Sequence, residues 1–173
     1  MTIKKFCASL CALSILPAAA TAAPATGDAQ IAVVTPLSFI QVENMHFGRI
    51  IPSAVPGTVT VATGNILTTT NGIASIGNSH QVAKFAGMGS QNQNVTIQVT
   101  PSTITLTGPG PSMAVTGLVI EPETTLQDQG GGNFQILPAD GIFWFTVGGT
   151  LNVAANQSPG SYAGTFAATL EYQ

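Results

Sequence analysis

The feature that most constrains the fold is a period of two in the apolar residues, which recurs along the chain in short runs rich in Val, Ile and Thr. Val95, Ile97 and Val99, for example, alternate with threonine and glutamine. Such alternation is typical of a strand with one side in a core and the other in solvent. No segment of helical length carries apolar residues at spacings of three and four. The chain is therefore predicted to be all-β.

Turn residues separate these runs at intervals of about ten residues, which is typical of β-sandwiches and barrels. We expect an immunoglobulin-like β-sandwich, with a closed barrel as the alternative. Residues 142–147 and 150–153 are predicted to form a hairpin around Gly148-Gly149, because paired glycines supply the positive φ angles of a two-residue turn.

Two further regions are rich in turn residues. Residues 127–133 contain three consecutive glycines and are expected to be a mobile loop between strands. Residues 65–81 contain two turn dipeptides, Asn71-Gly72 and Gly77-Asn78, and predict two short strands or a hairpin.

The two ends of the predicted domain alternate most clearly. Every even position of residues 162–172 is apolar or glycine, so we expect a last strand with one buried face. The odd positions of residues 29–39 are apolar except for Thr35. Pro36 interrupts this segment, and a proline cannot donate to a strand ladder. The segment is therefore expected to be an edge strand, a bulge, or two strands that meet at Thr35-Pro36.

Residues 1–22 have the pattern of an export signal. Two lysines precede an apolar stretch over residues 6–16, and small residues at 20–22 form a candidate cleavage site. The apolar stretch is too short for a spanning helix, and no later segment is long enough. We expect export through the periplasm to the cell surface or the outside. Both cysteines would leave with the leader, so neither a disulfide nor a thiolate site is expected afterwards.

Charged residues make up 6% of the chain, against about 25% in an ordinary soluble protein. Beyond residue 22 there are two basic residues, Arg49 and Lys84, and seven acidic ones. A sparsely charged chain with a negative balance has no electrostatic basis for holding a phosphate backbone. Nucleic acid is therefore excluded as a partner.

The titratable residues form no recognisable catalytic or metal-binding pattern. Neither His46 nor His80 has another ligand at metal-binding spacing. Glu121 and Glu123 flank a proline without a positioned partner, and Asp128 lacks the alternating oxygen ligands of a calcium loop. We predict no enzyme activity, no metal and no cofactor. A hydrolase is disfavoured because no coupled acid, base or nucleophile is present.

Trp144 lies between Phe143 and Phe145 and has two interpretations. An apolar run on both faces favours a central strand packed in a core, with an additional partner contact. The alternative function that follows from an exposed ring is a monomeric secreted carbohydrate- or surface-binding module. Its contact surface would include Trp144, Tyr162 and the polar residues 89–94.

The terminal segments resemble a known class of exported bacterial proteins. Gly160, the penultimate aromatic Tyr172 and the alternation between them are similar to the C-terminal signature of pilus subunits assembled by the chaperone–usher route. Residues 147–166 and 45–48 resemble the DUF4402 family, and more distantly the spore-coat-U-like pilins. Pilins often carry a disulfide near the first strand, and this chain departs from that pattern.

The resemblance implies a structural subunit whose immunoglobulin-like sandwich lacks its last strand. A periplasmic chaperone, and later the N-terminal strand of the next subunit delivered at an usher, would fill the groove. Residues 23–34 would be the donor arm, with Ala29, Ile31 and Val33 as its inserted side chains, and residues 35–173 the sandwich domain. The acceptor groove would be lined by Gly160, Tyr162, Phe166, Ala168, Leu170 and Tyr172. The arm could also fold back as the first strand of its own domain, and that alternative stays open.

Overall fold

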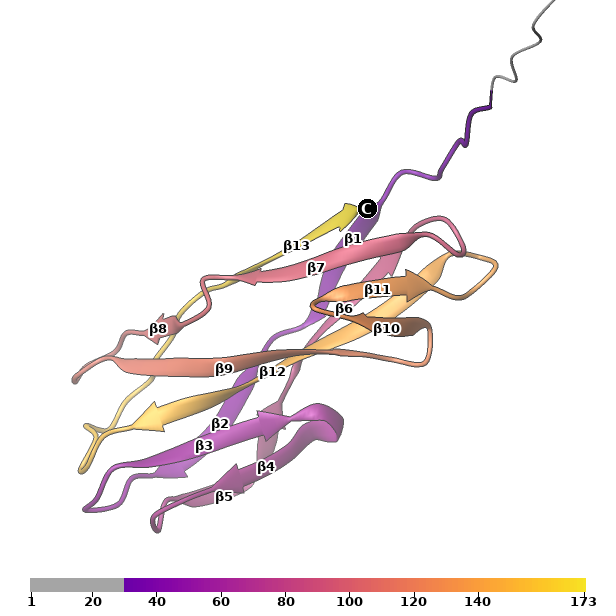
Figure 1. Ribbon diagram of the computed structural model, residues 1–173. Coiled ribbons are helices and arrows are strands. Elements are labelled where there is room, and N and C mark those ends of the chain that lie inside the picture. Colours follow the sequence, from indigo (N-terminus) through magenta and orange to yellow (C-terminus); the bar gives the residue numbers. More distant parts are fainter. Residues whose placement is uncertain (1–29) are drawn as a thin grey trace, which may run out of the picture. The chain divides into compact units, whose positions relative to one another are not determined.

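The computed structural model describes residues 30–173, which contain thirteen strands, one short 3₁₀ helix and no α-helix (Figure 1). The predicted all-β fold is confirmed. The expected leader and the start of the arm, including Ala29, lie outside the described residues. The elements are β1 (Ser38–Glu43), β2 (His46–Ile51), β3 (Gly57–Ala62), η1 (Thr63–Asn65), β4 (Ile66–Thr69), β5 (Ala74–Gln81), β6 (Ala83–Met88), β7 (Asn94–Thr100), β8 (Ile104–Leu106), β9 (Met113–Pro122), β10 (Leu126–Gly130), β11 (Asn133–Ile136), β12 (Ile142–Val153) and β13 (Ala167–Tyr172).

All strand pairs are antiparallel, and β12 is the centre of the larger sheet. One edge of β12 pairs first with β6 and then with β3, while its other edge pairs with β9. Outside these lie β1 next to β6, β4 next to β3, and β8 next to β9. A second sheet has the order β10-β11-β7-β13, and β2 and β5 form a two-stranded ribbon.

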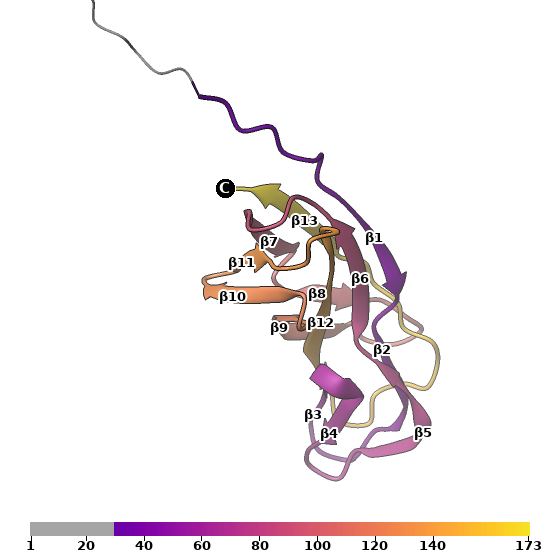
Figure 2. The same cartoon turned by 90° about the vertical axis from the view of Figure 1, so that its right-hand side faces the viewer.

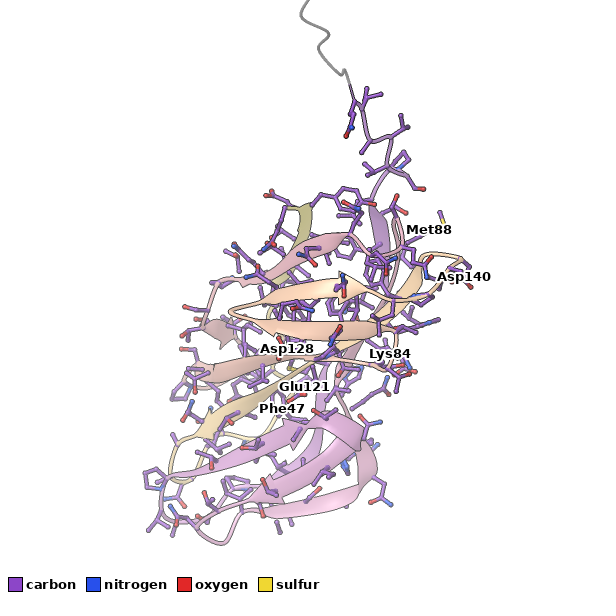
Figure 3. The ribbon with its side chains drawn as sticks, turned by 45° about the vertical axis from the view of Figure 1, so that its right-hand side comes forward. Phe47, Lys84, Met88, Glu121, Asp128 and Asp140 are labelled. Carbon is purple, nitrogen blue, oxygen red and sulfur yellow. The ribbon has the colours of Figure 1, made fainter. Side chains whose placement is uncertain are left out.

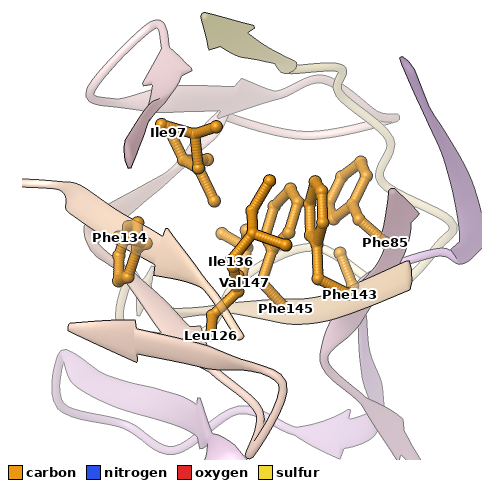
Figure 4. Packing of buried hydrophobic residues seen from close by; sticks show 10 residues of the cluster. Phe85, Ile97, Leu126, Phe134, Ile136, Phe143, Phe145 and Val147 are labelled. Carbon is orange, nitrogen blue, oxygen red and sulfur yellow. The ribbon is translucent and has the colours of Figure 1, made fainter. Parts of the chain in front are cut away.

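The two sheets pack face to face through a core rich in phenylalanine (Figure 4). Phe85 and Phe145 stack with their ring centroids 4.9 Å apart, beside the fully buried Phe143. Ile97 and Ile136 from the smaller sheet pack against these rings. This arrangement is the predicted β-sandwich.

A second buried cluster lies where β3, β8, β9 and the end of β12 come together. Its buried members are Val59, Ile73, Ile104, Met113, Val115, Leu151 and Val153. Phe47, Ile50 and Tyr162 pack against it but stay only partly buried.

The predicted hairpin at Gly148-Gly149 is wrong, because β12 runs straight through both residues without a positive φ angle. At this point the neighbour on one edge of β12 changes from β6 to β3. A Cβ atom on Gly148 would lie 2.6 Å from the Val61 carbonyl oxygen, and one on Gly149 would lie 2.9 Å from Leu118 Cδ2. The two glycines therefore allow a close approach of chains and do not form a turn.

The mobile loop expected at residues 127–133 is also wrong. β10 and β11 form a hairpin there, and all three glycines of the run, 130–132, have positive φ angles at its turn. Asp128 Oδ1 accepts a hydrogen bond of 2.8 Å from the Gly130 amide. A local side-chain acceptor and permissive glycines together make a turn that is ordered.

Two other expectations were met in part. Asn71 and Gly72 form the predicted turn, with φ angles of 54° and 77°. Gly77, the other predicted turn residue, lies inside β5 at a positive φ, opposite a register shift in β2. The alternating segment 29–39 becomes a strand only from Ser38, so among its described residues Pro36 precedes β1 and does not interrupt it.

We predict that Gly87→Ala destabilises the domain by about 1–3 kcal/mol, because the new methyl group would collide with the buried ring of Phe143 on β12. Urea unfolding of the chain measures the effect. Ala86→Ser, on the outward side of the same strand, is the matched control and should change stability by less than about 0.5 kcal/mol. Equal stability of the two variants would contradict the packing described.

Candidate functional site

An open groove of about 900 Å³ lies between two chain segments that are far apart in sequence. One wall is formed by residues 41–50, at the end of β1 and along β2, and the other by residues 160–166, before β13. The floor consists of apolar side chains of the second cluster. They are Ile104, Leu106, Met113, Val115 and Leu151.

Among the residues that the structure describes, the strands at the first wall and the strand that follows the second wall each have a hydrogen-bonded neighbour on one side only. β1 pairs with β6, β2 with β5, and β13 with β7. In Figure 2, β1 and β2 follow one another along one side of the unit. The edges that face away from these partners therefore carry backbone N–H and C=O groups without a strand ladder.

The side chains along both walls are only half-buried, although they pack against the core. The half-buried positions among residues 37–47 are odd-numbered, and those among residues 162–172 are even-numbered. Ile50, after the register shift in β2, is also half-buried. The half-buried apolar members are Met45, Phe47 and Ile50 on the first wall, and Tyr162 and Phe166 on the second. Beyond the groove the two rows continue through Phe39 and Leu37 on one side, and through Ala168, Leu170 and Tyr172 on the other. The core thus ends in a stripe of apolar surface that follows the groove and its continuation along β13.

Of the six groove residues predicted from the sequence, three line the groove and three lie beyond it. Gly160, Tyr162 and Phe166 line the cavity itself. Ala168, Leu170 and Tyr172 continue the same face along β13 against the first core cluster, beyond the cavity.

Gly160 shapes the start of the second wall. It has a φ of +146°, and a Cβ atom there would lie 2.6 Å from Cγ of Pro109. A side chain at this position would push the wall away from the Pro109 ring.

The sequence patterns did not identify the first wall as part of the groove. Residues 45–48 were noted only as a motif, yet Met45, Phe47 and Ile50 contact the second core cluster, and Arg49 lines the groove. The signal in the sequence is the apolar Met45, Phe47 and Ile50, which come shortly after the alternating Leu37 and Phe39. The sequence alone does not show that this wall faces residues 160–166, which lie more than a hundred positions later in the chain.

Tyr162 fixes the start of the second wall through its hydroxyl group. The hydroxyl accepts hydrogen bonds from the Gly110 amide (3.1 Å) and from Gln157 Nε2 (2.9 Å), and donates to the Ser158 carbonyl (2.9 Å). Gln157 is buried, and its Nε2 also donates to the Pro111 carbonyl.

Tyr172 has a similar role at the far end of the second wall. Its hydroxyl accepts from the Ser90 amide (2.7 Å) and donates to the Thr35 carbonyl (2.8 Å). The Thr35 amide in turn donates to Ser90 Oγ (2.6 Å). These three hydrogen bonds, which we call the Thr35 clasp, join the residues before β1 to the end of β13.

Of the predicted donor side chains, Ala29 lies outside the described residues. Ile31 and Val33 both have 89% of their surface exposed. Side chains of this kind lose contact with water only when a partner covers them.

Trp144, the candidate surface contact, is half-buried on β12. Lys84 Nζ lies over its ring, 5.0 Å from the centroid, and forms a 2.8 Å ion pair with Glu123. One face of the indole is therefore occupied by a cation–π contact.

In the described part of the chain, the charged side chains form no cluster beyond the Lys84–Glu123 ion pair. Asp140 lies near Met88 at one end of the unit, away from Asp128 and Glu121 (Figure 3). Within residues 30–173 there is no group of three or more His, Cys, Asp or Glu side chains that could hold a metal ion. His80 Nε2 lies 2.8 Å from the Asn65 carbonyl oxygen, a local contact.

Comparison with known proteins gives one match. A family model described as Domain of unknown function (DUF4402) matches residues 37–172. No curated protein matches the chain, and no solved structure does. Within the described part of the chain, no helix has the length and apolar character needed to cross a membrane.

We predict that Tyr162→Phe destabilises the domain by about 1–3 kcal/mol, because it leaves the buried Gln157 amide and the Gly110 amide with one acceptor fewer. Denaturant unfolding is the measurement. Thr165→Ala, an exposed change on the same segment, is the control and should alter stability by less than about 0.5 kcal/mol. A Tyr162→Phe variant as stable as this control would show that the hydroxyl does not hold the wall in place.

Proposed function

We propose that this chain, which belongs to the DUF4402 family, is a structural subunit of an extracellular fibre, pilus or surface coat. Its copies would join by adding a β-strand of one copy to the groove of another, without any chemical reaction. The observation that carries the proposal is the groove with an apolar floor, which lies between β2, paired on one side only with β5, and residues 160–166, which lead into the edge strand β13.

A β-strand is the occupant that fits these walls best. Its backbone would pair with one or both free edges, and its alternate side chains would point to the floor. A helix or a globular surface would leave the edge N–H and C=O groups unpaired. Covering the half-buried apolar side chains gains about 25 cal/mol per Å² of apolar surface removed from water.

The arm over residues 23–34 has the properties of such a strand. Ala29, Ile31 and Val33 alternate with Gln30 and Ala32, so one face is apolar. Its only charged residue is Asp28. Twelve extended residues span about 40 Å, long enough to follow residues 160–166 and β13 beyond them.

An assembly partner is needed before the groove is filled. A strand edge beside an apolar slot promotes aggregation when it is left open. The expected export signal and the resemblance of the terminal segments to chaperone–usher pilins support a periplasmic chaperone as the first occupant. Transfer at an usher would follow, and the final location would be the cell surface or the outside.

The carbohydrate-binding alternative stays a prediction. The indole ring on which it depends carries Lys84 on one face, which leaves less ring surface for stacking against a sugar.

We predict that Ile31→Asp/Val33→Asp in the full exported chain abolishes assembly, because two carboxylates would have to enter an apolar floor. Light scattering after size-exclusion chromatography measures the particle mass. The matched control is Gln30→Asp/Ala32→Asp, which adds the same charge to the other face of the arm. This control should assemble like the unaltered chain. If both double variants gave the particle masses of the unaltered chain, strand donation by the arm would be refuted.

A further inference from the structure

The outward face of the larger sheet carries an apolar patch that lies outside the groove. We infer that this patch binds the same patch on a second copy of the chain in a neighbouring fibre, so that fibres associate side by side. The inference rests on the proposed function, because it needs copies that are already joined into fibres, but it concerns a different surface.

The patch consists of two rows of side chains on β1, β6 and β12. In the first row, Met88 on β6 is paired in register with Ile142 on β12. In the second row, Ala86 on β6 lies between Ile40 on β1 and Trp144 on β12. The alternate residues of these strands are packed in the core, so the five side chains point to solvent. We call these five residues the β6 patch.

The side chains of the β6 patch are large and exposed. Ile40 has 68% of its surface exposed, Met88 44% and Ile142 42%. Ala86 and Trp144 are half-buried. Together they present roughly 300–400 Å² of apolar surface, which is the size of the largest patch on an ordinary monomer, and such patches are often functional.

The other half of the same outward face has a different composition. Its central row crosses β4, β3, β12 and β9 and consists of threonines: Thr68, Thr60, Thr150 and Thr116. The hydroxyl groups of Thr60 and Thr150 are 2.9 Å apart and share a hydrogen bond. Threonine combines a β-branched side chain with a hydroxyl group and suits the solvent side of a strand. The isoleucines, methionine and tryptophan of the β6 patch therefore depart from the way this sheet meets water elsewhere.

The charged groups around the β6 patch oppose an anionic partner. Lys84, which lies over the Trp144 ring, is held by Glu123 in an ion pair of 2.8 Å. Asp140, near Met88 in Figure 3, accepts a hydrogen bond of 3.1 Å from the Ile142 amide. An anionic membrane surface or a nucleic acid needs unpaired basic side chains. A second apolar patch needs none.

The size of the β6 patch favours a second copy within a fibre as its partner. Two patches packed face to face bury roughly 600–800 Å², whereas stable protein pairs bury about 1,200–2,000 Å². One such contact is too weak to hold two free monomers together. Between two fibres the contact repeats with every subunit, and linked contacts raise the overall affinity about 10²–10⁴-fold. A copy of the chain is the partner that a neighbouring fibre presents at matching intervals.

The variant Ile40→Lys/Ile142→Lys of the full chain tests the β6 patch, because two ammonium groups would have to lose their water in the contact. Electron microscopy of negatively stained fibres counts the fibres in each bundle. We expect the bundled fraction to fall about tenfold or more, with fibre length unchanged. The matched control is Thr68→Lys/Thr105→Lys, which adds the same charge to exposed threonines on the outward face of the same sheet. This control should form bundles like the unaltered chain.

Two measurements on the unaltered chain do not depend on the folding of a variant. Sedimentation before assembly should show monomers, and microscopy after assembly should show bundles. Stable dimers before assembly, single fibres after it, or bundles that persist in Ile40→Lys/Ile142→Lys would each overturn the inference and leave the proposed function in place. Binding to phosphatidylcholine vesicles that is lost in this variant, with single fibres throughout, would assign the patch to a lipid surface and also overturn it. A chain that forms no fibres would refute the proposed function itself.

Discussion

The structure depends on one constraint: the sandwich ends at two strand edges that have no neighbour between them among the described residues. β1 and β2 form one edge, and β13 with the segment before it forms the other. The side chains along both edges are apolar but only half-buried. A closed sandwich would bury these positions, so the constraint explains why the core stops where it does.

The rest of the domain holds these two edges in place. β12 spans both core clusters, and the glycines at 148 and 149 let its neighbour change from β6 to β3 without a break. The second sheet keeps β13 in register with β7, and the hydroxyl groups of Tyr162 and Tyr172 fasten the two ends of the second wall. Charge contributes little: one ion pair, between Lys84 and Glu123, is present in the described residues. Packing and backbone hydrogen bonds therefore position the groove.

Much of this could be predicted from local patterns, because the period of two is a property of each strand alone. The alternation of residues 162–172 agrees with the half-buried even-numbered positions, but the predicted strand is shorter, because only residues 167–172 form β13. The paired glycines at 148 and 149 led to the wrong prediction of a hairpin turn, because a close approach of two chains and a turn both require glycine. The first wall was missed because its place opposite residues 160–172 results from long-range pairing of β1 and β2 with β6 and β5. Nothing local in the sequence encodes that pairing.

The most direct test of the central claim is a structure of the assembled form by electron cryo-microscopy. The account predicts a strand from residues 29–34 of one copy between β2 and residues 160–172 of another, with Ile31 and Val33 facing the floor. A groove that is empty in the assembly, or one filled by residues of the same copy, would contradict it.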